Sequence, residues 1–310
     1  MSFAPVRLSI LRGDQKIGFE VFVEVASKHL LLLHKGDSFE GERLTRLKKK
    51  NLKKIFIRSE DEPLLRDYMA RNIEQAYDKS SKQSVENRVQ IIQGIQQSST
   101  EAVFENPEDK VAYDSAKQGS QKFAAFLLAE DNAVKKLLAV ENTDQNLAHH
   151  GVSVASLAVA IAKETGYKDL KNLSLIALGG MLHDLGHLLS GQNVAQPRES
   201  FSPEEIKIYQ NHPTTGAQKL KDLKHMDIQI TQIILEHEEN VNGGGFPGKL
   251  GENKLNPMSI FVESANIFDR LVTFEKLSQT EAVKQLMTKY IGRYPLAHFN
   301  AIKAIVKSVV

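Results

Sequence analysis

Short apolar runs separated by polar turns fill the first eighty residues, a pattern that is typical of β-strands. Two other stretches there have helical signals. Residues 36–51 predict a short helix, and residues 59–80 predict a longer one in which Pro63 suits the first turn. The expected strands cover residues 6–11, 16–25, 28–34 and 52–58. We therefore expect a small α+β domain over residues 1–80, and nothing in it has the spacing of a catalytic site.

The hydrophobic period changes to a helical one in the rest of the chain. From residue 111 onward, apolar residues recur at steps of three and four, and the segment after Gly151 is apolar on nearly all sides, as in a buried helix. Residues 81–110 are polar with a weak helical stripe and predict a helical linker. The expected helices cover residues 125–140, 149–166, 173–189, 202–220, 227–240 and 258–274. The fold class is thus mainly α, with an all-α domain over residues 111–310.

Composition narrows the chemistry of the chain. Its 310 residues include no cysteine, which excludes disulfides and leaves nitrogen and oxygen ligands for any metal. No apolar stretch reaches the ~18 residues that a membrane span needs, and the N-terminus does not resemble a signal peptide. We expect a cytoplasmic protein without membrane contact. The basic run KKKNLKK (48–54) is either a nucleic-acid patch or a solvated face, and the solvated face is favoured because an expected strand follows it.

Histidines are concentrated in the helical part of the chain. Seven of the ten lie between residues 149 and 237, and His150, His183, His212 and His237 fall in successive expected helices. Any single helical histidine is usually a surface or hydrogen-bonded residue. Asp184 is harder to explain in that way, because MLHDLGH sets a carboxylate in an otherwise apolar helix and burial of an uncompensated carboxylate is costly. A metal held between facing helices would compensate it.

Four ordered motifs resemble the HD-GYP family of the HD phosphohydrolase superfamily. His150 followed by His183–Asp184 resembles the histidine and HD pattern. NHPTTGAQKL (211–220) resembles the HP-x-x-G element, HEENVNGGGFPG (237–248) resembles HHE-x-x-DG-x-GYP, and ANIFDRL (265–271) resembles AD-x-x-DAL. The resemblance covers residues 111–275, and a set of long, ordered motifs is much more specific than one short pattern.

The resemblance implies a helical metalloenzyme that hydrolyses cyclic di-GMP or a related phosphodiester, with two divalent ions as cofactors, iron first and manganese as the alternative. Two such ions can activate a bridging hydroxide and neutralise a phosphodiester. Asp184, as the bridging ligand, and His187, as a substrate contact, are the implied catalytic residues. The implied metal ligands are His150, His183, Asp184, His212, His237, Glu238 and Asn266.

Several positions depart from the family pattern. Glu238 replaces the second histidine of HHE, and Asn266 replaces the aspartate of the AD element. Asn146 stands where members with three metals have glutamate, so a third ion is not expected. His187 replaces the lysine that contacts substrate phosphate, and Phe246 replaces the tyrosine of GYP. The arginines of the family's RPYR stretch have no counterpart. The metal ligands are therefore better preserved than the residues that contact substrate.

The glycine-rich segment is expected to form a loop for substrate or a protein partner, because its glycines allow close backbone approach. The family's loop is associated with contacts to diguanylate cyclase domains, which makes such a domain a candidate partner. The alternative is a helix terminator with Phe246 packed in the core. The loop consists of Gly243, Gly244, Gly245, Phe246 and Pro247.

Two functions from different classes remain open at this point. The favoured one is a metal-dependent cyclic di-GMP phosphodiesterase. The alternative is a weakly active or inactive signalling protein that binds a cyclic dinucleotide or a protein. A different phosphoester substrate is a third option, because HDLGH (183–187) is similar to the wider HD superfamily. The sequence does not determine the oligomeric state or the role of the N-terminal domain.

Overall fold

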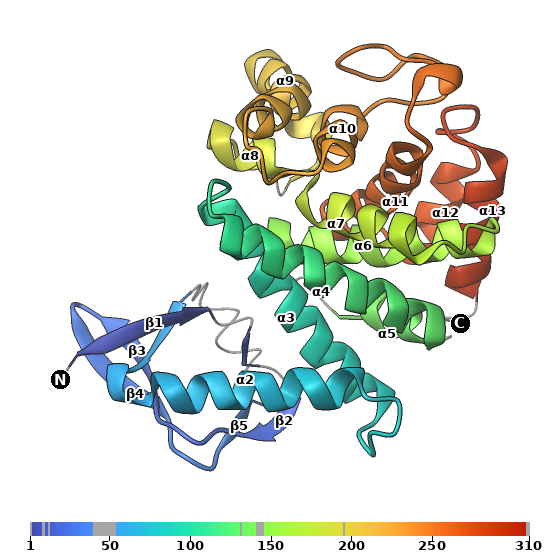
Figure 1. Cartoon of the computed structure of the whole chain (residues 1–310). Helices are drawn as coiled ribbons and strands as arrows, with labels where there is room; N and C mark the ends of the chain where they lie inside the picture. The colour runs from blue at the N-terminus through green and yellow to red at the C-terminus, as the bar shows by residue number, and fades with distance from the viewer. Residues whose placement is uncertain are drawn as a thin grey trace. The chain divides into compact units, whose positions relative to one another are not determined.

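A computed structural model of the chain describes residues 2–7, 10–11, 13–39, 54–130, 132–140, 146–194 and 196–307. The chain divides into two compact units, Met1–Ser98 and Ser99–Val310 (Figure 1). Helix α3 (Val85–Glu105) crosses the boundary between them. The first unit is of the α+β type, and the second consists of helices joined by loops in its described residues, which confirms the expected fold class.

Antiparallel strands and one long helix build the first unit. The four-stranded sheet has the order β1-β6-β3-β4, and β2 pairs with β5 in a second, two-stranded sheet. Helix α2 (Glu62–Tyr77) places Leu65 and Tyr68 in the same core as Ile55 and Ile57 of the sheet. The strands are β1 (Phe3–Arg7), β2 (Gly13–Lys16), β3 (Val21–Val25), β4 (Lys28–Leu33), β5 (Ser38–Phe39) and β6 (Lys54–Arg58).

Four strands were predicted and six are described, because β2 and β5 were not expected, and the predicted strands are shifted in their bounds. The first strand lies earlier than predicted, and the strand expected over 16–25 begins only at Val21. The short helix expected over 36–51 is wrong at its start, where Ser38–Phe39 form β5 in pairing with β2. The rest of that helix and most of the basic run fall on residues 40–53, outside the described part of the chain. The linker helix continues through Gly94 and is buried on more than one face, because Gln93 and Gln96 are as inaccessible as Ile92.

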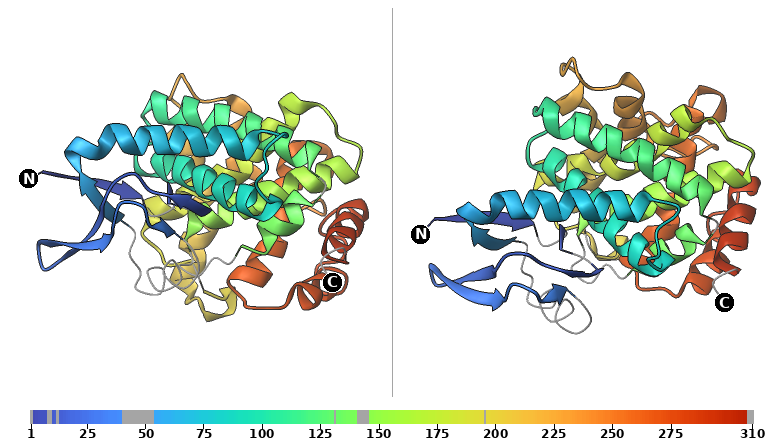
Figure 2. Two further views of the ribbon diagram at one scale, coloured as in Figure 1. Left: turned by 90° about the horizontal axis from the view of Figure 1, so that it is seen from below. Right: turned by 60° about the horizontal axis from the view of Figure 1, so that its bottom comes forward.

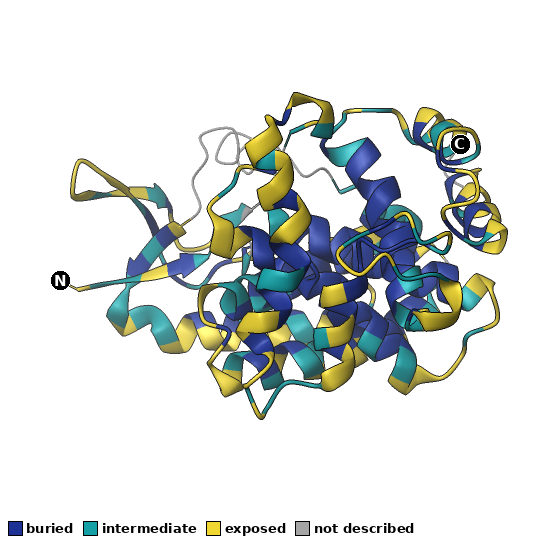
Figure 3. Cartoon of the chain, turned by 90° about the horizontal axis from the view of Figure 1, so that it is seen from above, coloured by how far each residue is buried: buried dark blue, intermediate teal, exposed yellow. Residues whose placement is uncertain are grey.

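The second unit packs its helices around α6 (Leu147–Glu164). Helices α4 (Lys110–Ala129), α7 (Leu170–Leu182) and α11 (Pro257–Thr273) all contact α6. In Figure 3 the buried residues, in dark blue, gather in the middle of the helical unit. Figure 2 shows α12 and α13 side by side near the C-terminus. The other helices are α5 (Ala133–Leu138), α8 (Leu185–Ser190), α9 (Pro203–Leu220), α10 (Ile228–Glu236), α12 (Gln279–Leu286) and α13 (Leu296–Lys307).

Two of the expected helices are interrupted, and one interruption matters for the site. The run 173–189 breaks after Leu182, so His183 and Asp184 lie in the junction between α7 and α8. Helix α10 ends at Glu236, so His237 also follows a helix end. The run 125–140 breaks after Ala129. The apolar period does not reveal the break at His183, because the residues on both sides of it are buried.

One described stretch, Leu170–Ser190, is apolar and long enough to span a membrane by length and composition, and most of it is buried inside the protein. It contains the buried pair His183–Asp184. Its apolar character is accounted for by its place in the middle of the helical unit.

Acid is expected to destabilise the helical unit through His298. This side chain in α13 is buried, stacks on Phe261 and hydrogen-bonds through Nδ1 to the Ser264 hydroxyl at 2.8 Å. Burial lowers the pKa of His298 from 6.5 to about 4. The unfolded chain therefore binds the proton first, so this contribution to stability is complete above the unfolded pKa and is lost as the pH falls toward 4.

We expect the wild type to lose about 2 kcal/mol more stability than His298→Gln between pH 7 and pH 5. Glutamine keeps a hydrogen-bonding group but does not titrate. Urea unfolding at both pH values, with chelator present throughout, measures the difference. The same pH dependence in both proteins would contradict the assignment.

Candidate metal centre

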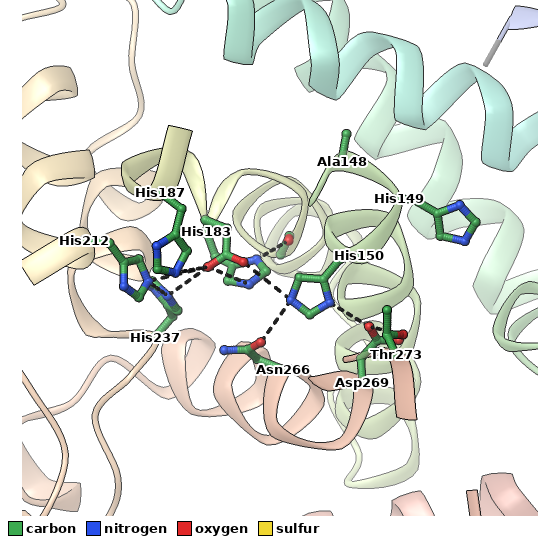
Figure 4. A network of polar contacts seen from close by, with 12 residues as sticks. Ala148, His149, His150, His183, His187, His212, His237, Asn266, Asp269 and Thr273 are labelled. Carbon is green, nitrogen blue, oxygen red and sulfur yellow. Dashed lines mark hydrogen bonds and ion pairs between the residues drawn. The ribbon is translucent and has the colours of Figure 1, made fainter. Parts of the chain in front are cut away.

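Helix ends and helix interiors from distant parts of the sequence bring the predicted histidines together. His150 lies inside α6 and His212 inside α9, whereas His183 and His237 directly follow α7 and α10. Figure 4 shows their rings pointing toward one another from four sides. Each of these rings is at most 1% exposed, so the cluster is closed off from solvent.

Asp184 occupies the centre of the cluster, with its two oxygens facing different histidines. Its Oδ1 lies 3.3 Å from Nε2 of His183, 3.5 Å from Nε2 of His212 and 3.6 Å from Nε2 of His237. Its Oδ2 lies 3.5 Å from Nε2 of His150. Asp184 is therefore placed to join two neighbouring groups of ligand atoms.

Backbone carbonyls fix which nitrogen of each ring faces the centre. Nδ1 of His183 donates to the Gly180 carbonyl at 2.7 Å, and Nδ1 of His237 donates to the Ile234 carbonyl at 2.8 Å. His212 makes the same bond to the carbonyl three residues before it. Because a neutral imidazole has one proton, these bonds leave Nε2 as the ring atom with a free lone pair.

For His150, the side chain of Asp269 fixes which ring nitrogen faces the centre. Its Oδ2 accepts the Nδ1 proton of His150 at 2.6 Å and also accepts the Thr273 hydroxyl proton at 3.1 Å. The sequence prediction missed Asp269 as a site residue. The signal was present, because Asp269 follows Asn266 by three residues and therefore lies on the same face of α11.

Lone pairs then face each other across the cluster. Nε2 of His212 and Nε2 of His237 are only 2.8 Å apart, and Nε2 of His150 is 3.1 Å from the Asn266 amide oxygen. Nε2 of His183 and Oδ2 of Asp184 have no hydrogen-bond partner among the described residues although both atoms are buried. Such an arrangement is repulsive unless a cation lies between the atoms, so these residues fit a divalent metal site.

The electrostatics of the apoprotein agree with that fit. Burial lowers the pKa of His183 to about 3, more than the nearby Asp184 carboxylate raises it. Burial opposes ionisation of Asp184, but the adjacent histidines His183 and His187 hold the pKa of this carboxyl well below its usual range. A neutral imidazole at His183 and an ionised carboxylate at Asp184 are the protonation states that metal ligands require.

Asn266 and Glu238 differ in their hydrogen-bond partners. The Asn266 amide nitrogen donates to Glu263 at 3.3 Å, which turns its oxygen toward His150 and the cluster. Glu238 accepts from Arg198 at 2.7 and 3.0 Å and from the Tyr209 hydroxyl. Burial opposes the charge of Glu238, but Arg198 lowers the pKa of this carboxyl to about 2. Arg198 and Tyr209 were not predicted, and only the folded chain brings them to Glu238.

His187 lies within the cluster. Its ring stacks on that of His212 with centroids 3.6 Å apart, and its Nε2 is 3.7 Å from Oδ1 of Asp184. Asp184, His187 and His212 together offer ligand atoms close enough to share one ion. The position is thus compatible with a metal ligand as well as with the substrate contact that the sequence suggested.

Two residues near the motif histidines have local roles. Asn146 is the N-cap of α6, accepting from the backbone of Ala148 at 2.7 Å, and its amide donates to Glu101 at 3.0 Å. His149 points away from the cluster (Figure 4) and contacts the Val140 carbonyl at 3.0 Å. Neither side chain belongs to the groups of ligand atoms found among the described residues.

The glycine-rich loop folds back on the end of the HEE segment. A Cβ on Gly245 would lie 2.4 Å from Cα of Glu239, so only glycine allows this approach. The Phe246 amide donates to the Glu238 carbonyl at 3.1 Å, and its half-buried ring lies against Tyr209. Phe246 therefore borders the cluster, whereas Pro247 is exposed.

The helical fold, the HD pair and the surrounding histidines define a protein of the HD class. Residues 132–294, just over half of the chain, match the model of the HD domain family, and the chain belongs to this family. Its whole length is similar to a solved structure, Bd1817, an HDG"Y"P protein from Bdellovibrio bacteriovorus. The two are 43% identical with a TM-score of 0.94, over 99% of this chain and 100% of that one.

Curated relatives match the helical part. The cyclic di-GMP phosphodiesterase PA4108 of Pseudomonas aeruginosa is 22% identical over 189 residues, which are 59% of this chain and 45% of that protein. The cyclic di-GMP phosphodiesterase of Thermotoga maritima is 28% identical over 134 residues, 43% of this chain and 36% of that protein. The chain thus spans less than half the length of these curated relatives.

Proposed function

We propose that the chain is a metal-dependent phosphodiesterase that hydrolyses cyclic di-GMP or a related phosphodiester. The observation that carries the proposal is the convergence of unprotonated Nε2 atoms on Asp184, with lone pairs facing each other at 2.8 Å. The names of the curated relatives, as cyclic di-GMP phosphodiesterases, suggest the substrate.

The described residues form three overlapping groups of ligand atoms, and two of these groups contain Asp184, which favours two ions that share this carboxylate. One group is His150, His183 and Asp184, and the next is Asp184, His187 and His212, with His237 and Glu238 adjoining His212. Nitrogen and oxygen ligands without sulfur suit iron or manganese. When bound, such ions supply Lewis-acid stabilisation of a phosphodiester and lower the pKa of water.

The residues around the cluster prepare the ligands and keep the site dry. Asp269 and the backbone carbonyls hold the imidazoles in one tautomer and one orientation, which avoids reorganisation when substrate binds. Phe274 packs on His150 with ring centroids 5.1 Å apart, and Phe246 covers the Tyr209 side. A low local dielectric constant, where water is excluded, strengthens electrostatic interactions with a bound anion.

The test is turnover of cyclic di-GMP by protein purified without oxygen, with iron and manganese measured on the same sample. We expect bound metal and the linear dinucleotide or GMP as product, detected by chromatography. Metal-loaded protein that forms no product from cyclic di-GMP would contradict hydrolysis of this substrate.

A second candidate is a binding protein with little or no activity, which recognises a cyclic dinucleotide or a diguanylate cyclase-type domain. The specific observation in its favour is that Glu238 is engaged by Arg198 and Tyr209. Calorimetry would then show binding of cyclic di-GMP by protein that gives no product.

A further inference from the structure

Arg270 in α11 is the largest fully buried side chain among the described residues, with 1% of its surface exposed. All three of its guanidinium nitrogens are inaccessible, and none has a hydrogen-bond partner in the described part of the chain. The guanidinium lies over two aromatic rings, those of Tyr209 and Phe274, with its carbon 5.2 Å from each ring centroid. A buried cation without an acceptor is costly, so its retention points to a missing anion.

The position of Arg270 is beside the metal centre. The Phe274 ring contacts His150 at 5.1 Å between centroids, and the Tyr209 ring contacts His187 at 5.0 Å. Arg270 therefore touches the two rings that border opposite parts of the cluster. In the AD-x-x-DAL element that ANIFDRL resembles, the position of Arg270 is alanine, so this cation is an addition to the pattern.

The acidic side chains in this region already have other partners. Asp269 accepts from His150 and Thr273, and Glu238 accepts from Arg198 and Tyr209. Glu263 accepts from Tyr294 at 2.7 Å and from Asn266. Arg198 provides the contrast, because it also lies over Tyr209, at 4.6 Å, but forms an ion pair with Glu238. The anion for Arg270 must therefore come from a ligand.

We propose that Arg270 binds a phosphate oxygen of the phosphoester that occupies the metal centre. The planar guanidinium presents paired N–H donors that match the oxygens of a phosphate, and stacking on aromatic rings fixes its plane. The family pattern has a lysine that contacts substrate phosphate, and His187 replaces it in this chain. Arg270 would supply a fixed positive charge in place of that lysine. The inference rests on the proposed function in taking a phosphoester as the ligand.

The probe is inorganic phosphate, titrated against metal-loaded protein and followed by the rise in Tm. We expect phosphate to stabilise the wild type, and Arg270→Gln to bind phosphate about 10-fold or more weakly with unchanged metal content. Arg270→Lys should fall between them, because it keeps the charge without the paired donors. The matched control is Arg293→Gln, which removes the same charge from an exposed position and should respond as the wild type does.

Equal phosphate affinity in the wild type and Arg270→Gln would overturn the proposal. If Arg270→Gln does not fold, the comparison of the wild type with Arg270→Lys decides in the same way. Turnover of cyclic di-GMP on the same samples separates the two claims. A phosphate response that depends on Arg270 without turnover supports the anion site and removes the proposed substrate. Turnover with an unchanged KM in Arg270→Gln supports the function and overturns the role of Arg270.

Discussion

Replacing Asp184 with asparagine is expected to remove both bound metal and turnover. Asp184 is 3% exposed, and its two oxygens face Nε2 atoms of histidines from four different segments. Asparagine keeps the shape but loses the negative charge and one of the two ligand oxygens. We expect metal per chain to fall to background and the rate of cyclic di-GMP hydrolysis to fall at least ~100-fold. This loss is larger than the usual effect of substituting a residue that only orients a metal ligand.

Elemental analysis and product chromatography on the same preparations measure this prediction. The matched control is Asp222→Asn, which removes the same charge from an exposed position in the helical unit. In excess chelator, the wild type and Asp184→Asn should have similar Tm values. The reason is that chelator removes from the wild type the stabilisation by bound metal that the variant already lacks. Full metal content and turnover in Asp184→Asn would refute the assignment of the centre.

Replacing Gly186 with alanine is expected to push apart the two helices that carry His187 and His212. A Cβ on Gly186 would lie 1.9 Å from the His212 carbonyl oxygen and 3.0 Å from the Gly216 nitrogen. Both neighbours are backbone atoms, so no rotamer change relieves the clash. We expect a loss on the order of 3 kcal/mol, which corresponds to a fall in Tm of roughly 6 to 12 °C.

The same substitution should also weaken metal binding, because moving α9 shifts His212 away from Asp184. Thermal unfolding and chelator competition measure the two effects. Gly251→Ala is the control, because its Cβ would meet only the Val241 oxygen, at 3.8 Å, and its backbone does not have a positive φ. If Gly186→Ala matches Gly251→Ala in Tm and metal affinity, the close approach of α8 and α9 is not required.

The helical class and the candidate ligand histidines could be read from the sequence because both are local properties. A three- and four-residue apolar period marks helices wherever they later pack. His183 and Asp184 are adjacent, and an ionisable pair in an apolar run implies compensation of a buried charge. The assignments of all these residues as metal ligands, and of His187 as a substrate contact, remain predictions.

The sequence could not define the helix bounds or the partners of the site residues. Apolar residues continue through the break at His183, so periodicity alone predicted one helix where two meet. Sequence comparison with family motifs suggested a loss of substrate-binding cations, and it gave no weight to Arg270 because the motif has alanine at that position.

The sequence by itself determined that the chain is mainly helical, that a bound metal would need nitrogen and oxygen ligands because cysteine is absent, and in which order the histidine motifs occur. Only the tertiary structure decided that Asp269 orients His150 and that Arg198 forms an ion pair with Glu238. It also decided that Arg270 has no hydrogen-bond acceptor among the described residues. The reason is distance along the chain. The bond between His150 and Asp269 joins residues 119 positions apart. A helical period specifies which face of each helix is buried, but the packing of whole helices selects which buried side chains meet.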